Sequence, residues 1–110
     1  MPRTPRCDAP GVWRHVMNRG IARRPIFETA GDVRFFEAQL ARTVRDGLIE
    51  VHAFCVMTTH FHLLARSPCG RISDAMQAIQ NRYARWFNRG RLRDGPVFRG
   101  RFRGPVVSSL

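Results

Sequence analysis

The sequence predicts an α+β fold of the ferredoxin-like type, with the element order β-α-β-β-α-β, a four-stranded antiparallel sheet and two helices on one face. Three observations predict it. Apolar residues alternate in four short segments, they recur at three- and four-residue spacing in two longer segments, and turn residues separate the segments. The 110 residues suit a single domain, with a predicted core over about residues 10–107.

The first half of the chain supplies a strand, a loop and a helix. Residues 12–18, VWRHVMN, alternate as a strand, and residues 19–30 form a loop that contains glycine, proline and an arginine pair. Residues 32–46 have apolar side chains at helical spacing. Gly47 follows directly and is a typical helix stop, so we expect the helix to end there.

The central part of the chain predicts a hairpin. Residues 48–57 and residues 60–66 both alternate as strands, and only two threonines lie between them. Threonine is poorly suited to the positive φ of the tightest hairpin turns, so we expect a longer or strained turn. In residues 48–57 strict alternation would place the apolar odd-numbered side chains on one face.

The last part of the chain predicts a helix and a final strand. Residues 72–89 have apolar side chains at three- and four-residue steps and form an amphipathic helix that ends at Gly90. Tyr83 lies on its apolar stripe, while arginines occupy a different face. Residues 97–107, VFRGRFRGPVV, have arginines at alternate positions and predict the last strand.

The charge indicates the kind of partner. The net charge is +11, and all 19 basic residues are arginine, with no lysine. The planar guanidinium binds phosphates through two hydrogen bonds and stacks on bases, so a small and strongly basic domain is typical of nucleic-acid binding. A genome rich in G and C would explain arginine in place of lysine, but it would not explain the excess of positive charge.

Several classes of protein are disfavoured by the sequence. No run of 18 apolar residues predicts a membrane-spanning helix, and the first ten residues contain no apolar segment of a signal peptide. The three cysteines are odd in number and have no CxxC spacing, which argues against a disulfide framework and against a cysteine zinc site. We therefore expect a cytoplasmic protein.

Two histidines stand out in the segment VMTTHFHLLA. On a strand, His60 and His62 point to the same face, about 6.5–7 Å apart, while Phe61 points to the other. Two imidazoles at this separation can converge on a metal ion, which would suit phosphodiester chemistry. A half-buried pair without a metal fits the same pattern. Glu50 and His52 on the neighbouring strand are candidates for a third ligand, and the sequence selects neither.

Three segments resemble the single-tyrosine HUH transposases of the REP-associated type: WRHVMNRGIARRPIFE, VHAFCVMTTHFHLLAR and NRYARWFNRGRLRDGPVFRGRFRG. The resemblance covers roughly residues 10–104. It implies the ferredoxin-like fold, and it implies that His60 and His62 ligate a divalent metal, Mg²⁺ or Mn²⁺. It also implies an HUH endonuclease that acts on hairpin-bearing single-stranded DNA, as a monomer or homodimer. In that reaction, which serves DNA transposition and recombination, a tyrosine attacks the phosphodiester and becomes attached to the 5′ phosphate.

The sequence departs from the family at two places. Thr59 stands where the family usually has asparagine. The family's catalytic tyrosine lies on a helix after the last strand, in a stretch resembling RYVxxNPVRAG, and this sequence contains no such stretch. The expected nucleophile and the third metal ligand from that helix are therefore missing. Tyr83 is the only tyrosine, and its place on the apolar stripe predicts a core residue rather than a nucleophile.

Arginines and aromatic residues interleave between residues 82 and 103, which is typical of single-strand binding surfaces. The alternative is that the aromatics are core and the arginines are a solvated face. His15 could join the DNA surface or be structural, and Arg23 and Arg24 could contact DNA or form a charged loop. The predicted nucleic-acid-binding residues are Arg19, Arg82, Arg85, Arg89, Arg99, Arg101 and Arg103.

Two functions follow from the sequence. The first is a transposase that binds, cleaves and joins single-stranded DNA with a metal at His60 and His62. The second is a catalytically inactive DNA-binding module, or a remnant, derived from a transposase. The missing tyrosine segment is the feature that separates them.

Overall fold

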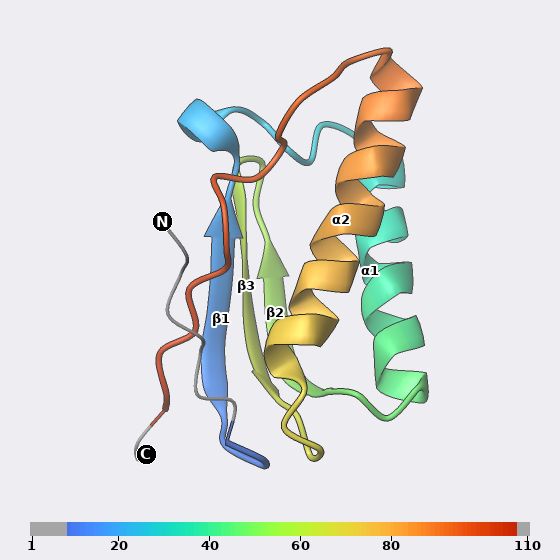
Figure 1. The fold of residues 1–110 in the computed structure, drawn as a ribbon. Coiled ribbons are helices and arrows are strands. Elements are labelled where there is room, and N and C mark those ends of the chain that lie inside the picture. The colour runs from blue at the N-terminus through green and yellow to red at the C-terminus, as the bar shows by residue number, and fades with distance from the viewer. Residues whose placement is uncertain (1–8, 108–110) are drawn as a thin grey trace.

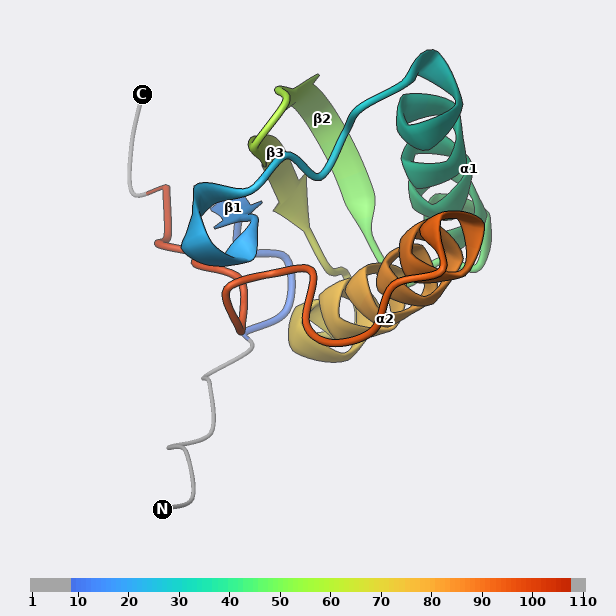
Figure 2. The same cartoon turned by 90° about the horizontal axis from the view of Figure 1, so that it is seen from above.

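The computed structural model describes residues 9–107, which form two layers (Figure 1). Both helices lie on one face of a three-stranded sheet (Figure 2), and we call the face that neither helix covers the open face. Within the described residues, no helix is long and apolar enough to cross a bilayer. The elements are β1 (Arg14–Arg19), the 3-10 turn η1 (Ile21–Arg23), α1 (Ala30–Arg45), β2 (Glu50–Val56), β3 (His60–Arg66) and α2 (Ile72–Arg91).

The sheet is antiparallel throughout and has the order β1-β3-β2, so β3 is central. Along β3 every second side chain is buried, and these are Phe61, Leu63 and Ala65. His60 and His62 therefore lie on the open face, as the alternation predicted. The two helices and three strands confirm the predicted α+β arrangement of these elements.

A β-bulge interrupts β2. The pairing register with β3 shifts between Val51 and Ala53, because His52 is an extra residue with no partner on β3. Val51 packs against the core, whereas Cys55 is paired opposite His62 and lies on the open face. The prediction that all odd-numbered residues of this strand share one face is therefore wrong beyond the bulge.

The predicted fourth strand over residues 97–107 is not a regular strand. The segment runs along the free edge of β1, and its register changes on the way. Arg103 and Arg99 are four residues apart, but their partners Met17 and Arg19 are only two apart, so two extra residues bulge out of the pairing. The isolated bridges join Arg14 with Val106, Met17 with Arg103, and Gly20 with Phe98.

Two buried amide side chains hold this bulge. Asn18 Nδ2 donates to the Gly100 carbonyl at 2.8 Å and to Gln80 Oε1 at 3.0 Å, and Gln80 Nε2 lies 3.4 Å from the same carbonyl. The Gly100 carbonyl is thus bonded to side chains rather than to the backbone of β1. These contacts explain physically why the segment leaves the regular ladder.

The core lies between the sheet and the helices, with Tyr83 of α2 near its centre. The Tyr83 side chain is fully buried, and its hydroxyl donates a hydrogen bond to the Ile26 carbonyl. The aromatic rings around it are Phe27, Phe35, Phe36, Trp86, Phe87 and Phe98. This position agrees with the prediction that Tyr83 is a core residue.

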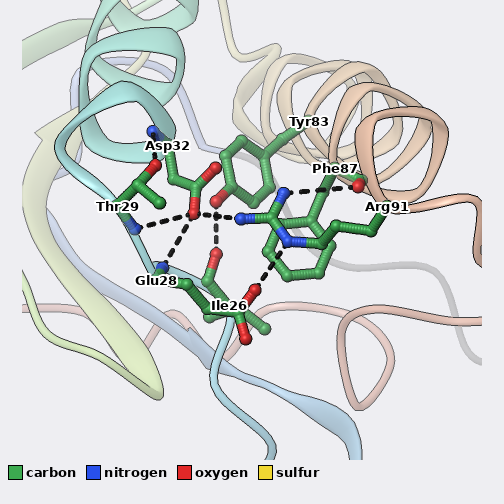
Figure 3. A network of polar contacts seen from close by, with 7 residues as sticks. All are labelled: Ile26, Glu28, Thr29, Asp32, Tyr83, Phe87 and Arg91. Carbon is green, nitrogen blue, oxygen red and sulfur yellow. Dashed lines mark hydrogen bonds and ion pairs between the residues drawn. The ribbon is translucent and has the colours of Figure 1, made fainter.

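A polar network joins the start of α1 to the end of α2 (Figure 3). Thr29 caps α1 by accepting a hydrogen bond from Asp32 N at 3.1 Å, and Asp32 Oδ2 accepts bonds from Thr29 N and Glu28 N. Arg91 contacts Asp32 Oδ2 and Glu28 Oε1, each at 2.6 Å, and its guanidinium lies 3.8 Å from the Phe87 ring centroid. The network holds the last turn of α2, which continues past the predicted end at Gly90.

The loop between β1 and α1 is bonded to the β2–β3 turn directly before His60. The carbonyls of Thr58 and Thr59 accept hydrogen bonds from the backbone N–H groups of Gly20, Ile26 and Phe27. Met57 N donates to the His60 carbonyl at 2.8 Å, which closes a two-residue hairpin. Neither threonine has the positive φ of the turn types that two-residue hairpins favour. The hydrogen bonds from the loop between β1 and α1 therefore hold this turn.

We expect Arg91→Met to lower the free energy of unfolding by about 2–3 kcal/mol, because it leaves the buried Asp32 carboxylate without its cation. Urea denaturation followed by circular dichroism measures this change. The control is Arg89→Met, which removes the same charge from an exposed position in the same turn. Equal losses in the two variants would contradict the assignment of a stabilising role to Arg91.

We expect Gly20→Ala to destabilise the fold by about 2 kcal/mol or more, because an added Cβ would lie 2.2 Å from the Arg24 carbonyl oxygen. Gly90→Ala is the matched control. A Cβ at Gly90 meets no atom within 4 Å, and helix propensity favours alanine by about 0.5–1 kcal/mol. The two substitutions should therefore shift the thermal midpoint in opposite directions, and a shift in the same direction would count against this packing.

Candidate metal and nucleic-acid site

His60 and His62 form a pair on the open face, with ring centroids 5.0 Å apart and nearly perpendicular planes. His60 Nδ1 lies 3.0 Å from Thr59 Oγ1, and His62 Nδ1 lies 2.9 Å from His15 Nε2. No residue within 9–107 is hydrogen-bonded to the Nε2 atom of either ring. Each ring is thus oriented through one nitrogen, and its other nitrogen can serve as a metal ligand.

The chemistry of the pair fits a divalent cation in part. Burial lowers the pKa of His62, and the neighbouring His60 and His15 lower it further. This favours the neutral imidazole, which is the form that binds metal ions. Within the described residues, however, no group of three histidine, cysteine, aspartate or glutamate side chains is placed to hold an ion. His60 and His62 would therefore supply two ligands, and phosphate oxygens or water could complete the coordination of Mg²⁺ or Mn²⁺.

The two candidates for a third ligand lie away from the pair. Glu50 forms an ion pair with Arg66 at 3.1 Å, at the far end of β3 from His60. His52 lies at the bulge of β2, and its ring centroid is 6.0 Å from that of Trp13. The structure does not bring either side chain to the histidine pair.

His15 is a neighbour of the histidine pair, and its role could not be assigned from sequence patterns. It lies on the open face of β1, and its ring is stacked on that of His62 with centroids 5.1 Å apart. Alternation along β1 indicates the face on which His15 lies. The contact with His62 depends on the pairing of β1 with β3, which local patterns do not reveal.

A pocket of about 290 Å³ opens beside His60, where the end of β1 and the start of β3 meet the segment over residues 97–107. In Figure 1 η1, the β2–β3 turn and the first part of this segment lie at the same end of the sheet, and the segment then continues along β1. The pocket joins one predicted metal ligand to four of the predicted nucleic-acid-binding residues. Its lining includes His60 and five arginines, Arg19, Arg23, Arg99, Arg101 and Arg103.

The described lining of this pocket contains five arginines and no aspartate or glutamate. In the described part of the chain, no carboxylate forms an ion pair with Arg19, Arg23, Arg99 or Arg103. Burial lowers the pKa of Arg19, and the charges of Arg99, Arg23 and Arg103 lower it further. A concave surface with this excess of one sign attracts anions.

The other three predicted nucleic-acid-binding arginines lie on α2, in the helical layer (Figure 1). Arg82 Nε donates to Gln39 Oε1 of α1 at 2.7 Å, and Arg85 and Arg89 are exposed. The seven arginines therefore divide into two groups, and four of them share the pocket beside His60.

Tyr83 is not part of this site. Burial raises the pKa of its hydroxyl well above the ordinary value, the carboxylates of Asp32 and Glu28 raise it further, and Arg91 partly opposes them. Its hydroxyl is fully buried and bonded to the Ile26 carbonyl, on the helical side of the sheet. It is neither accessible nor readily deprotonated.

Two solved structures have a fold similar to that of this chain. The structure of a REP-associated tyrosine transposase bound to a REP hairpin matches with a TM-score of 0.72 and 16% identity, over 100% of this chain and 64% of that one. A candidate transposase from Deinococcus radiodurans R1 matches with a TM-score of 0.68 and 18% identity, over 97% of this chain and 87% of that one. At these identities the matches show a shared fold.

The chain spans about 64% of the length of the hairpin-bound transposase. No curated protein matches the sequence. The family model described as "Transposase IS200 like" matches residues 9–97, which include β1, the histidine pair and α2. Because this match extends over most of the sequence, the chain belongs to the IS200-like transposase family.

Proposed function

We propose that the open face binds single-stranded DNA and holds a divalent cation at His60 and His62 for cleavage and joining of the strand during transposition. The observation that carries this proposal is the pocket in which His60 lies beside five arginines. A DNA strand that follows the arginines would bring a phosphate to the histidine pair. The similar transposase that was solved with a REP hairpin supports hairpin DNA as the substrate.

The residues on the open face would have two roles, binding of the phosphate backbone and orientation of the metal ligands. The arginines neutralise and position the phosphate backbone, which supplies most of the affinity and makes it dependent on salt. His15 orients His62 through the contact at 2.9 Å, and Thr59 orients His60 through the contact at 3.0 Å. A bound Mg²⁺ or Mn²⁺ would polarise the phosphate and stabilise the charge that develops on it.

The nucleophile is the part of the reaction that the described residues do not supply. Tyr83 is the only tyrosine, and it is buried on the opposite side of the sheet. We propose that a tyrosine nucleophile comes from outside this sequence. The second candidate function, a DNA-binding module without cleavage activity, is favoured by the same burial and by the lack of a third clustered ligand among residues 9–107.

The finer features of the fold belong to the same proposal. The segment over residues 97–107 lies at the free edge of β1, where the fourth strand of a ferredoxin-like sheet would lie. We propose that it takes the place of that strand, so that the 110 residues form a single HUH domain with its core over about residues 10–107. A homodimer and a cytoplasmic location stay predictions.

We expect His60→Ala and His62→Ala each to weaken Mn²⁺ binding by more than about tenfold, because each removes a ligand. Isothermal titration calorimetry measures the affinity. His52→Ala is the control, since His52 also lies on a strand but is distant from the pair. Equal weakening in all three variants, or tight Mn²⁺ binding by the His60→Ala/His62→Ala double variant, would contradict the proposed ligands.

We expect Tyr83→Phe to leave any covalent protein–DNA adduct unchanged while it lowers the free energy of unfolding by about 1–2 kcal/mol through loss of a buried hydrogen bond. The assay mixes the protein with single-stranded hairpin oligonucleotides and Mn²⁺, and detects adducts that survive denaturation. An adduct that Tyr83→Phe and His60→Ala both abolish would make Tyr83 the nucleophile. No adduct with any variant, together with salt-sensitive DNA binding by fluorescence anisotropy, would favour the inactive module.

A further inference from the structure

We propose that Arg23, held by a strained loop, completes a pocket that binds one phosphate group of a nucleic-acid strand beside His60. The inference rests on the proposed function, because the phosphate belongs to the DNA that the open face would bind. It adds a specific phosphate subsite and a residue whose role the sequence left open.

The backbone of η1 is the first observation. Ala22 and Arg23 have φ values of 53° and 58°, so two consecutive residues with side chains occupy the left-handed region. The left-handed conformation is energetically unfavourable for residues other than glycine. It persists where the surrounding structure imposes it, often at functional sites. Here the Ile21 N–H is bonded to the Val97 carbonyl, and the Arg24 N–H to the Ile21 carbonyl. The loop is therefore attached to the segment that carries Arg99, Arg101 and Arg103.

The charges in the pocket are the second observation. Arg23 is at the pocket wall with Arg19, Arg99 and Arg103, and within residues 9–107 none of these four has a carboxylate partner. Arg19 Nε is buried and has no hydrogen-bond partner there. Buried polar groups are nearly always bonded, and an anion in the pocket would supply an acceptor for this donor. A phosphate supplies several charged acceptor oxygens and matches the guanidinium fork.

The size and position of the pocket are the third observation. Its volume of about 290 Å³ is at the small end of ligand pockets, which suits a phosphate with its sugar rather than a duplex. Thr59 and His60 line the same pocket. A phosphate bound by Arg23 would therefore lie beside the proposed metal ligands, and the strand attached to it would continue over the open face.

Arg24 is a matched control for Arg23. It follows directly in the sequence and carries the same charge, but it has an ordinary φ of −70° and lines a different pocket, which contains Asp94 and Glu28. Removing either arginine changes the net charge equally. A difference between the two variants therefore reports the pocket rather than the overall charge of the protein.

The test measures the binding of inorganic phosphate by calorimetry and the binding of hairpin oligonucleotides by anisotropy over a range of salt concentrations. Arg23→Gln should weaken both by about tenfold, and it should reduce the slope of log K against log salt by about 0.7, the value for one contact to a single strand. Arg24→Gln should change both affinities by less than about twofold. Oligonucleotides with a 5′-phosphate and with a 5′-hydroxyl distinguish a terminal phosphate from an internal one, and an effect of Arg23 on either supports the pocket.

Arg23→Gly separates binding from folding. It should raise the thermal midpoint of the free protein by about 2–5 °C, because glycine relieves the left-handed strain, while it binds phosphate as weakly as Arg23→Gln. Equal effects of Arg23→Gln and Arg24→Gln on DNA binding would overturn the inference and leave the proposed function intact. If the wild-type protein bound neither phosphate nor DNA, both would fail.

Discussion

The alternation of side chains along β3 is the constraint on which the rest of the structure depends. β3 is paired on both sides, and Phe61, Leu63 and Ala65 bury one of its faces against the helices. A slip of one residue would expose these apolar side chains and bury His60 and His62, so hydrophobic burial specifies the register strongly. The position of the histidine pair on the open face is thus a consequence of how the core packs on the other face.

Arginines have different electrostatic surroundings in the helical layer and on the open face of the sheet. In the helical layer Arg91 is neutralised by Asp32 and Glu28 and packs on Phe87, so its charge contributes to the attachment of α2 to α1. At the end of the open face, one pocket is lined by four arginines that form no ion pair with a carboxylate among the described residues: Arg19, Arg23, Arg99 and Arg103. Like charges that are not balanced repel one another and do not stabilise a fold. We therefore interpret the pocket as a binding surface and the Arg91 network as a structural contact.

Three segments that are distant in the sequence build the end of the open face. The loop over residues 20–27 bonds to the β2–β3 turn, and the segment over residues 97–103 bonds to the loop and to β1. Asn18 and Gln80 tie that segment to α2 through the Gly100 carbonyl. The geometry of the pocket is therefore coupled to the core, although none of its arginines belongs to the core.

The sequence by itself determined the features that follow from local periodicity. Alternation placed His60 and His62 on one face, helical spacing placed Tyr83 in the core, and the motifs indicated the transposase family. The positions of His60, His62 and Tyr83 are predictable because a side chain's face depends only on its position within its own strand or helix.

Only the tertiary structure decided which faces and segments meet. The bulge at His52 turns Cys55 toward His62, the pairing of β1 with β3 brings His15 to His62, and the bonds to Gly100 break the ladder over residues 97–107. The seven predicted arginines were likewise divided between α2 and the pocket. Each of these outcomes depends on contacts between residues that are far apart in the chain. The packing of the whole core selects which of these residues pair, and no local sequence pattern encodes that choice.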